Sequence, residues 1–176
     1  MKPQITLIAG LAMTAVSFGA VSAADESEAS ACLAPMSAYS AGMPTVEGAE
    51  GLTPEKRIVE TTMAFKEVMD AAERSHTCFQ GAIDDGATGD ELAALQAGVV
   101  ETNRIFANVQ SQFSDALDMM SGDVLSDVAP AAGEGAEADL EAEATTVAGM
   151  ELLFDSYMAL ERSQEISKRL SRTAAK

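Results

Sequence analysis

Apolar side chains recur at alternating steps of four and three between residues 53 and 83. This spacing is typical of the inward face of a long helix that packs against other helices. Thr53 and Pro54 favour a helix start, because a threonine hydroxyl caps free N–H groups and proline fits the first turn. We predict a helix over residues 53–83. Its inward positions are Ile58, Thr62, Phe65, Met69, Ala72, His76, Phe79 and Ile83.

Residues 88–121 keep the same alternation over their whole length. Thr88 and Glu91 have the spacing of a capping box, in which each side chain accepts a hydrogen bond from the other residue's backbone N–H. Because only residues 84–87 separate this helix from the first, we predict that the two form an antiparallel hairpin. The inward positions are Leu92, Leu95, Val99, Thr102, Phe106, Val109, Phe113, Ala116 and Met120.

Residues 145–172 carry a third apolar stripe, which is broad and drifts around the helix. A helix here would provide the third wall that the hairpin needs, so the predicted fold is an all-α bundle with coiled-coil-like packing. The predicted bundle has two to three long helices. The alternative is a hairpin whose seam is completed by a second copy, which gives a four-helix or larger bundle. The stripe consists of Val147, Met150, Leu153, Phe154, Tyr157, Leu160, Ile166 and Leu170.

Two segments lack a sustained period. Residues 24–52 contain prolines, glycines and many small residues, and we expect a flexible arm without regular structure, held at Cys32. Residues 122–144 are rich in alanine, glycine and acidic residues, and we expect an acidic mobile loop whose part from Ala136 onward can extend the last helix. The chain is then a helical bundle, residues 53–176, that follows an arm.

The first 23 residues have the pattern of a bacterial-type secretory signal peptide. Lys2 precedes an uncharged run from Ile5 to Val21, which at about 17 residues is shorter than a typical membrane span. Small residues follow, and we predict cleavage after Ala23 and a periplasmic or secreted protein without a transmembrane segment in the mature chain. An uncleaved anchor and a lipoprotein acylated at Cys32 are the alternatives.

The net charge of the chain argues against nucleic-acid binding. The chain has 28 acidic and 11 basic residues, a net charge of −17, and removal of the signal peptide with its single lysine makes this −18. Nucleic-acid binding needs a basic surface, so we expect no nucleic-acid partner. Residues 162–176 are the exception, with a net charge of +4. Their bases are Arg162, Lys168, Arg169, Arg172 and Lys176.

This basic end has two interpretations. Cations stabilise the C-terminus of a helix, which accounts for the charges near the last turn. The other interpretation is a docking surface for an acidic partner, for an anionic lipid surface, or for the acidic residues 134–143 of the same chain. The five bases are therefore candidate interaction residues.

Cys32 and Cys78 are the two cysteines of the chain. An even number in an oxidising compartment favours a disulfide, and we predict that they are bridged. Closing the loop between them would restrict the unfolded chain by about 3–4 kcal/mol in the entropy model. Free or intermolecular thiols are the alternative.

His76 is the one histidine and lies at an inward position of the first helix. It is a weak candidate metal ligand, since a histidine among core methionines would suit Cu(I). The methionines concerned are Met63, Met69, Met119, Met120, Met150 and Met158. The simpler interpretation is a structural histidine in a core that methionine fills.

Catalytic motifs are absent from the sequence: it has no phosphate-binding glycine loop, nucleophile elbow or zinc-protease helix motif. We therefore expect neither an enzyme nor a cofactor. Our interpretation is a non-enzymatic periplasmic or secreted helical interaction protein, an adaptor, assembly or structural component of the cell envelope that binds a protein partner. Self-association is left open. The alternative function is a small metal- or ligand-binding bundle that uses His76 and core methionines.

Overall fold

The computed structural model describes residues 27–46, 51–127 and 136–176, with the side chains of 123–127 and 136–146 left out. The predicted signal peptide, residues 1–23, lies outside this part. The described residues form four helices and no strands: α1 (Glu28–Ser37), α2 (Pro54–Asp84), α3 (Gly89–Asp127) and α4 (Ala136–Ala174). The all-α prediction is confirmed. The expected two to three helices become three long ones and a short one, and coiled-coil-like packing stays a prediction.

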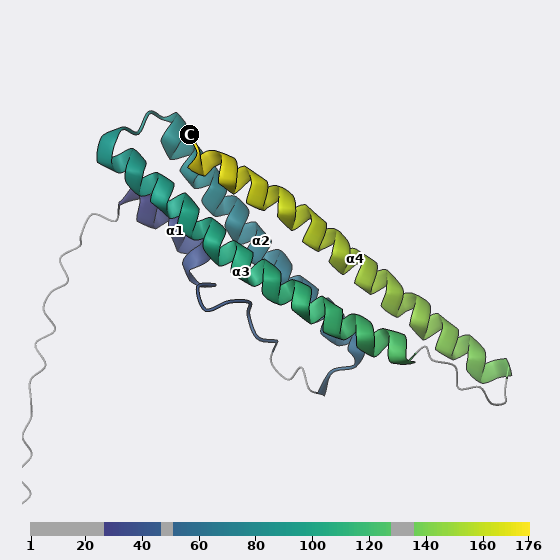
Figure 1. The fold of residues 1–176 in the computed structure, drawn as a ribbon. Helices are drawn as coiled ribbons and strands as arrows, with labels where there is room; N and C mark the ends of the chain where they lie inside the picture. The colour runs from purple at the N-terminus through teal and green to yellow at the C-terminus, as the bar shows by residue number, and fades with distance from the viewer. Residues whose placement is uncertain (1–26, 47–50, 128–135) are drawn as a thin grey trace, which may run out of the picture.

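The helices are arranged around an antiparallel α2–α3 hairpin (Figure 1). Both α1 and α4 pack against each helix of this hairpin, from opposite sides of it (Figure 1). α4 runs antiparallel to α3 and parallel to α2, so the C-terminus lies near the turn between α2 and α3 (Figure 1). Within the described residues, no helix combines the length and the apolar character needed to cross a membrane.

The core lies between α2 and α3, as the apolar spacing predicted. Every predicted inward position of these two helices is buried or half-buried. The ring of Phe65 stacks on that of Phe113 at a centroid distance of 3.9 Å, and the ring of Phe106 lies parallel at 6.4 Å. The start of α2 is also as predicted, because the Thr53 hydroxyl accepts a hydrogen bond from the backbone N–H of Lys56 at 3.4 Å.

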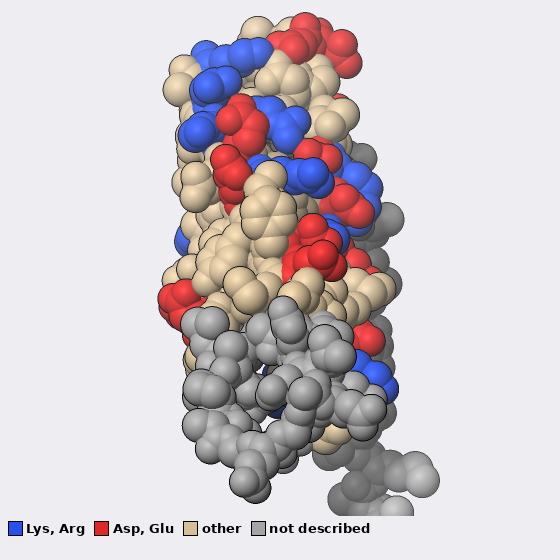
Figure 2. Space-filling view, turned by 90° about the vertical axis from the view of Figure 1, so that its right-hand side faces the viewer, with Lys and Arg blue, Asp and Glu red and all other residues tan. Residues whose placement is uncertain are grey.

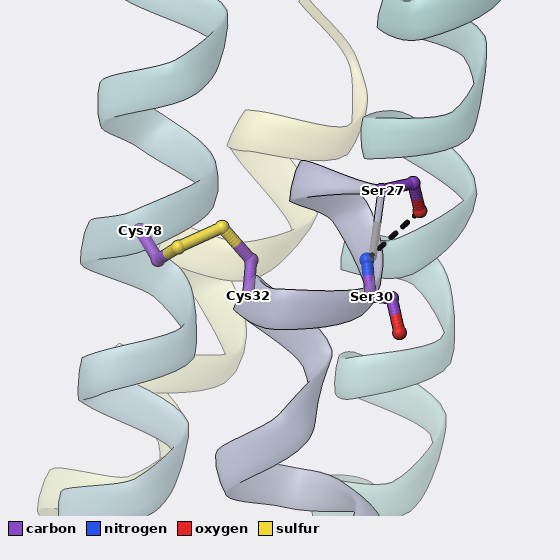
Figure 3. The surroundings of a disulfide bond; sticks show 4 residues. All are labelled: Ser27, Ser30, Cys32 and Cys78. Atoms are coloured by element: carbon purple, nitrogen blue, oxygen red, sulfur yellow. Dashed lines mark hydrogen bonds between the residues drawn. A yellow bond between two sulfur atoms is a disulfide. The ribbon is translucent and has the colours of Figure 1, made fainter. Parts of the chain in front are cut away.

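The predicted flexible arm, residues 24–52, contains α1, which the sequence analysis missed. The Ser27 hydroxyl caps this helix by accepting from the N–H of Ser30 at 3.3 Å (Figure 3). Cys32 and Met36 of α1 are fully buried in the core. They are the buried positions of this helix, and Pro35, a residue that disfavours helix interiors, lies between them. A ten-residue helix with one buried pair shows too little periodicity to be predicted.

The predicted disulfide is present and joins two helices. Cys32 of α1 is bonded to Cys78 of α2, with 5.3 Å between their Cα atoms (Figure 3). After α1, the backbone N–H of Met43 donates to Gln112 Oε1 of α3 at 2.7 Å. The preceding Gly42 has φ +119°, and a Cβ there would lie 2.5 Å from the Gln112 amide. Only glycine therefore suits this position.

The predicted mobile loop, residues 122–144, is largely helical. α3 continues to Asp127 and α4 begins at Ala136, so the Ala/Glu-rich part extends the last helix as one interpretation allowed. Alanine and glutamate have high helix propensity, and this favours a helix even where no apolar stripe marks it. The stretch between these helices, residues 128–135, lies outside the described part.

We expect Gly98→Ala to destabilise the protein although alanine favours helices. A Cβ at this buried position of α3 would lie 2.6 Å from ring carbons of the fully buried Phe79. Overpacking of about 1–3 kcal/mol exceeds the gain in helix propensity, so the free energy of unfolding should fall by about 1 kcal/mol. Urea denaturation measures it.

Gly122→Ala is the matched control in the same helix. Nothing lies within 4 Å of a Cβ at Gly122, so this change should stabilise the protein by about 0.5–1 kcal/mol. Two variants that shift the urea midpoint in the same direction would contradict the close contact between α2 and α3 at Phe79.

The disulfide should stabilise the protein mainly through the unfolded chain. The double variant Cys32→Ala/Cys78→Ala should lose about 3–4 kcal/mol of unfolding free energy, while the helical circular dichroism of α2, α3 and α4 persists. Hydrogen exchange should speed up first in α1, which the bridge holds. Equal stability of the wild type with and without a reductant would contradict this prediction.

Candidate functional site: the outward face of the last helix

The inward face of α4 consists largely of small and hydroxyl-bearing residues. Gly149, Ser156, Ala159, Ser163 and Thr173 are all buried on it. Larger side chains are interspersed among them at Leu153, Ile166 and Leu170. α4 thus covers the hairpin with less apolar bulk than α2 and α3 place between each other.

Hydrogen bonds compensate for the buried hydroxyls. Ser156 Oγ lies 2.7 Å from Thr62 Oγ1 of α2 and donates to the Leu152 carbonyl within α4. Ser163 Oγ accepts from Gln110 Nε2 of α3 at 2.7 Å. A buried hydroxyl without a partner would cost about 1–3 kcal/mol, so these bonds fix which side of α4 faces the hairpin.

The outward face of α4 carries the large apolar side chains instead. Val147, Met150, Phe154 and Tyr157 are 50, 53, 65 and 43% exposed. Steps of three, four and three place them on one side of the helix, over about 15 Å. Of the eight residues of the broad apolar stripe, these four therefore lie on the outward side of α4. The stripe is too broad for one interface, and the hydroxyl-bearing residues occupy the inward side.

Part of this face is hollowed. Val147, Met150 and Phe154 line a shallow groove of about 510 Å³ together with the carboxylates of Glu151 and Asp155. Figure 2 views the side of the molecule on which α4 lies in Figure 1. It shows an uncharged tan area with acidic side chains to its left and right, and with both acidic and basic side chains above it. At its α3 edge, the Tyr157 hydroxyl lies 3.2 Å from Ser121 Oγ.

We call Val147, Met150, Phe154 and Tyr157 the α4 stripe. Among the described residues, the other large apolar side chains that are similarly exposed are Met63, Val100 and Met119. Met63 and Met119 line two grooves that share Thr45 and Val46, and Val100 lies 19 residues before Met119 in α3. Singly exposed apolar residues of this kind are normal for a protein surface. A contiguous row at helical spacing is instead typical of a binding face.

A second groove, of about 590 Å³, lies where the segment after α1 meets the hairpin. Met43, Met119 and Met120 line it beside Arg57 and Gln112. Gln112 already holds the Met43 backbone, so we assign this groove to the seating of residues 43–46 on α2 and α3.

The basic end of the chain lies along α2. Arg169 pairs with Glu73 at 2.7 Å and Lys176 with Asp84 at 3.2 Å, both across to α2. Hydrogen bonds from Gln80 and Lys176 hold the pKa of Asp84 below its ordinary value. Exposed pairs of this kind contribute little to stability.

The other three candidate interaction residues are exposed on α4. Lys168 lies 3.7 Å from Glu165 in its own helix, and Arg162 and Arg172 are exposed. The acidic residues 134–143 that were considered as an internal partner lie outside the described side chains.

His76 is half-buried between α2 and α4. Its Nε2 lies 3.1 Å from Thr173 Oγ1, which in turn donates to Gln80 Oε1 at 3.0 Å. Burial and then the positive charge of Arg169 lower the pKa of His76 from its ordinary value of 6.5. The contacts are those of a hydrogen-bonded structural histidine, in keeping with the simpler interpretation.

The described residues contain no group of three or more His, Cys, Asp or Glu side chains arranged to hold a metal ion. The helical methionines named as possible partners of His76 do not all lie in the core, because Met63, Met119 and Met150 are exposed.

Comparisons of the chain with protein-family models, with curated proteins and with solved structures give no match. The sequence does contain a signal for the α4 stripe, which the sequence analysis overlooked. Gly149, Ser156 and Ser163 recur every seven residues and mark a face of small side chains. Such a face suits close helix contact, and the bulky residues opposite it are then left outside.

His76 should make stability depend on pH in a defined direction. Its folded-state pKa is lowered, so as the pH falls below about 6.5 the unfolded chain takes up the proton first and the folded state loses stability. The measurement is urea denaturation of the wild type and of His76→Gln between about pH 7.5 and 5. The stability of the wild type relative to the variant should fall on acidification. A relative stability that rises on acidification would contradict the lowered pKa.

Proposed function

We propose that this protein is an exported, non-enzymatic helical interaction protein that binds a protein partner in the cell envelope through the α4 stripe. The observation that carries the proposal is the row of large apolar side chains left exposed on the side of α4 opposite the hairpin. Burying such side chains in a complex would gain about 25 cal/mol for each Å² of apolar surface removed from water. A helix laid along α4 could remove much of it.

The export part of the proposal rests on separate features. The apolar run of residues 5–21 and the small residues before Ala24 match a cleavable signal peptide. A disulfide between α1 and α2 is typical of proteins in an oxidising compartment such as the periplasm. An adaptor, assembly factor or structural component of the envelope would be consistent with both the proposed export and the α4 stripe.

Site-specific photocrosslinking in the intact envelope of the producing cell tests this function. Phe154 is replaced by the photocrosslinking residue p-benzoylphenylalanine. The fold should tolerate the larger aromatic side chain, because the Phe154 side chain is 65% exposed. We expect a discrete protein adduct from position 154, because a bound partner must cover this ring.

Val100 provides the control position. Its side chain is 58% exposed on α3 and is not part of the α4 stripe, so the same crosslinker there should give little or no adduct. Equal adducts from both positions, or none from position 154, would refute the proposed function.

A further inference from the structure

Within α4, the charged residues beside the α4 stripe are acidic. Residues 147–161 contain Glu151, Asp155 and Glu161 and no lysine or arginine. All three acidic side chains are exposed, and the first two line the groove beside Met150 and Phe154. Glu151 and Asp155 are four residues apart and therefore lie along one flank of the stripe. A partner must supply apolar side chains opposite the row and positive charge opposite that flank.

Two bases near the C-terminus are engaged elsewhere in the same chain. Arg169 and Lys176 pair with Glu73 and Asp84 of α2, and so lie on another part of the bundle. The negative charge beside the α4 stripe has the same sign as the net charge of the mature chain, which is −18 once the predicted signal peptide is removed. Such a field attracts a basic partner over distances of about a Debye length.

Two other occupants fit these charges poorly. A second copy packed antiparallel, stripe against stripe, would bring the Glu151 and Asp155 carboxylates of both copies to the same side of the contact, where like charges repel. An anionic lipid surface would be repelled by the same carboxylates, because amphipathic helices that bind such membranes are rich in Lys and Arg.

From these observations we infer that the partner presents a basic amphipathic helix, which lies along the α4 stripe with apolar residues on Val147, Met150, Phe154 and Tyr157 and with Lys or Arg beside Glu151 and Asp155. This inference rests on the proposed function and names the chemistry of its partner. The length of the stripe, about 15 Å, corresponds to three turns of the bound helix.

A pair of designed peptides tests the inference. Both are helices of about 18 residues with leucine at steps of three and four, and they differ only in carrying lysine or glutamate at the flanking positions. Fluorescence anisotropy with the processed chain should show saturable binding of the lysine peptide, at least about tenfold tighter than that of the glutamate peptide and weaker at high salt.

Variants locate the binding. Phe154→Ser should weaken the lysine peptide at least about tenfold, and Glu151→Lys/Asp155→Lys should reverse the preference between the two peptides. Circular dichroism should show unchanged melting, because these side chains are exposed. The fold of each variant is thereby checked separately from its binding.

The control variants lie on α2, where Glu60 precedes the exposed Met63 by three residues and Glu67 follows it by four. Met63→Ser and Glu60→Lys/Glu67→Lys should leave peptide binding unchanged. Equal effects of the α2 and α4 variants would overturn the inference, as would equal binding, or no binding, of the two peptides.

Two further results separate this inference from the proposed function. Sedimentation that shows a dimer abolished by Phe154→Ser, or binding to anionic vesicles lost in the same variant, would overturn the basic partner. So would a crosslink from position 154 to a protein without a basic amphipathic segment, although that result would leave the proposed function intact. Absence of any adduct at position 154 would overturn both.

Discussion

Burial of the apolar seam between α2 and α3 is the constraint on which the rest of the structure depends. The stacked rings of Phe65 and Phe113, with Phe106 beside them, occupy its centre. A two-helix hairpin leaves such a seam open to water on two sides. α1 closes one side and α4 the other, as their packing against both hairpin helices shows.

The two helices that close the seam, α1 and α4, are held to the hairpin by different interactions. α1 has ten residues, too few to be stable alone, and it is held by the Cys32–Cys78 bond and the burial of Met36. α4 has 39 residues and needs no covalent tie. Small side chains bring it to the hairpin, and hydroxyl groups such as those of Ser156 and Ser163 bond to α2 and α3. Directional bonds then fix its rotation, which apolar contact alone would leave less defined.

How far the sequence could predict the fold follows from these differences. In α2 and α3 the apolar residues form one face of each helix and polar residues form the rest. The inward positions could therefore be assigned residue by residue. α1 could not be found, because two buried residues around a proline carry no period. The rotation of α4 could not be assigned either, since its bulky residues and its small residues form competing faces. In α4, the size of the side chains decides the inward face more than their hydrophobicity does. The small residues Gly149, Ser156 and Ser163 let α4 approach the hairpin closely, which the bulky Phe154 would prevent.

That competition also explains how a binding face can exist on a bundle with a closed core. An exposed row of Met150, Phe154 and Tyr157 would promote indiscriminate association if its surroundings were neutral. Glu151 and Asp155 beside it impose a cost on like-charged or uncharged contacts, since each carboxylate loses water without gaining a cation. Burial of the apolar side chains then provides the binding energy for a partner, and the carboxylates determine which partners can bind. Because the hydroxyl bonds on the opposite side hold α4 in one rotation, both properties are presented on the same fixed surface.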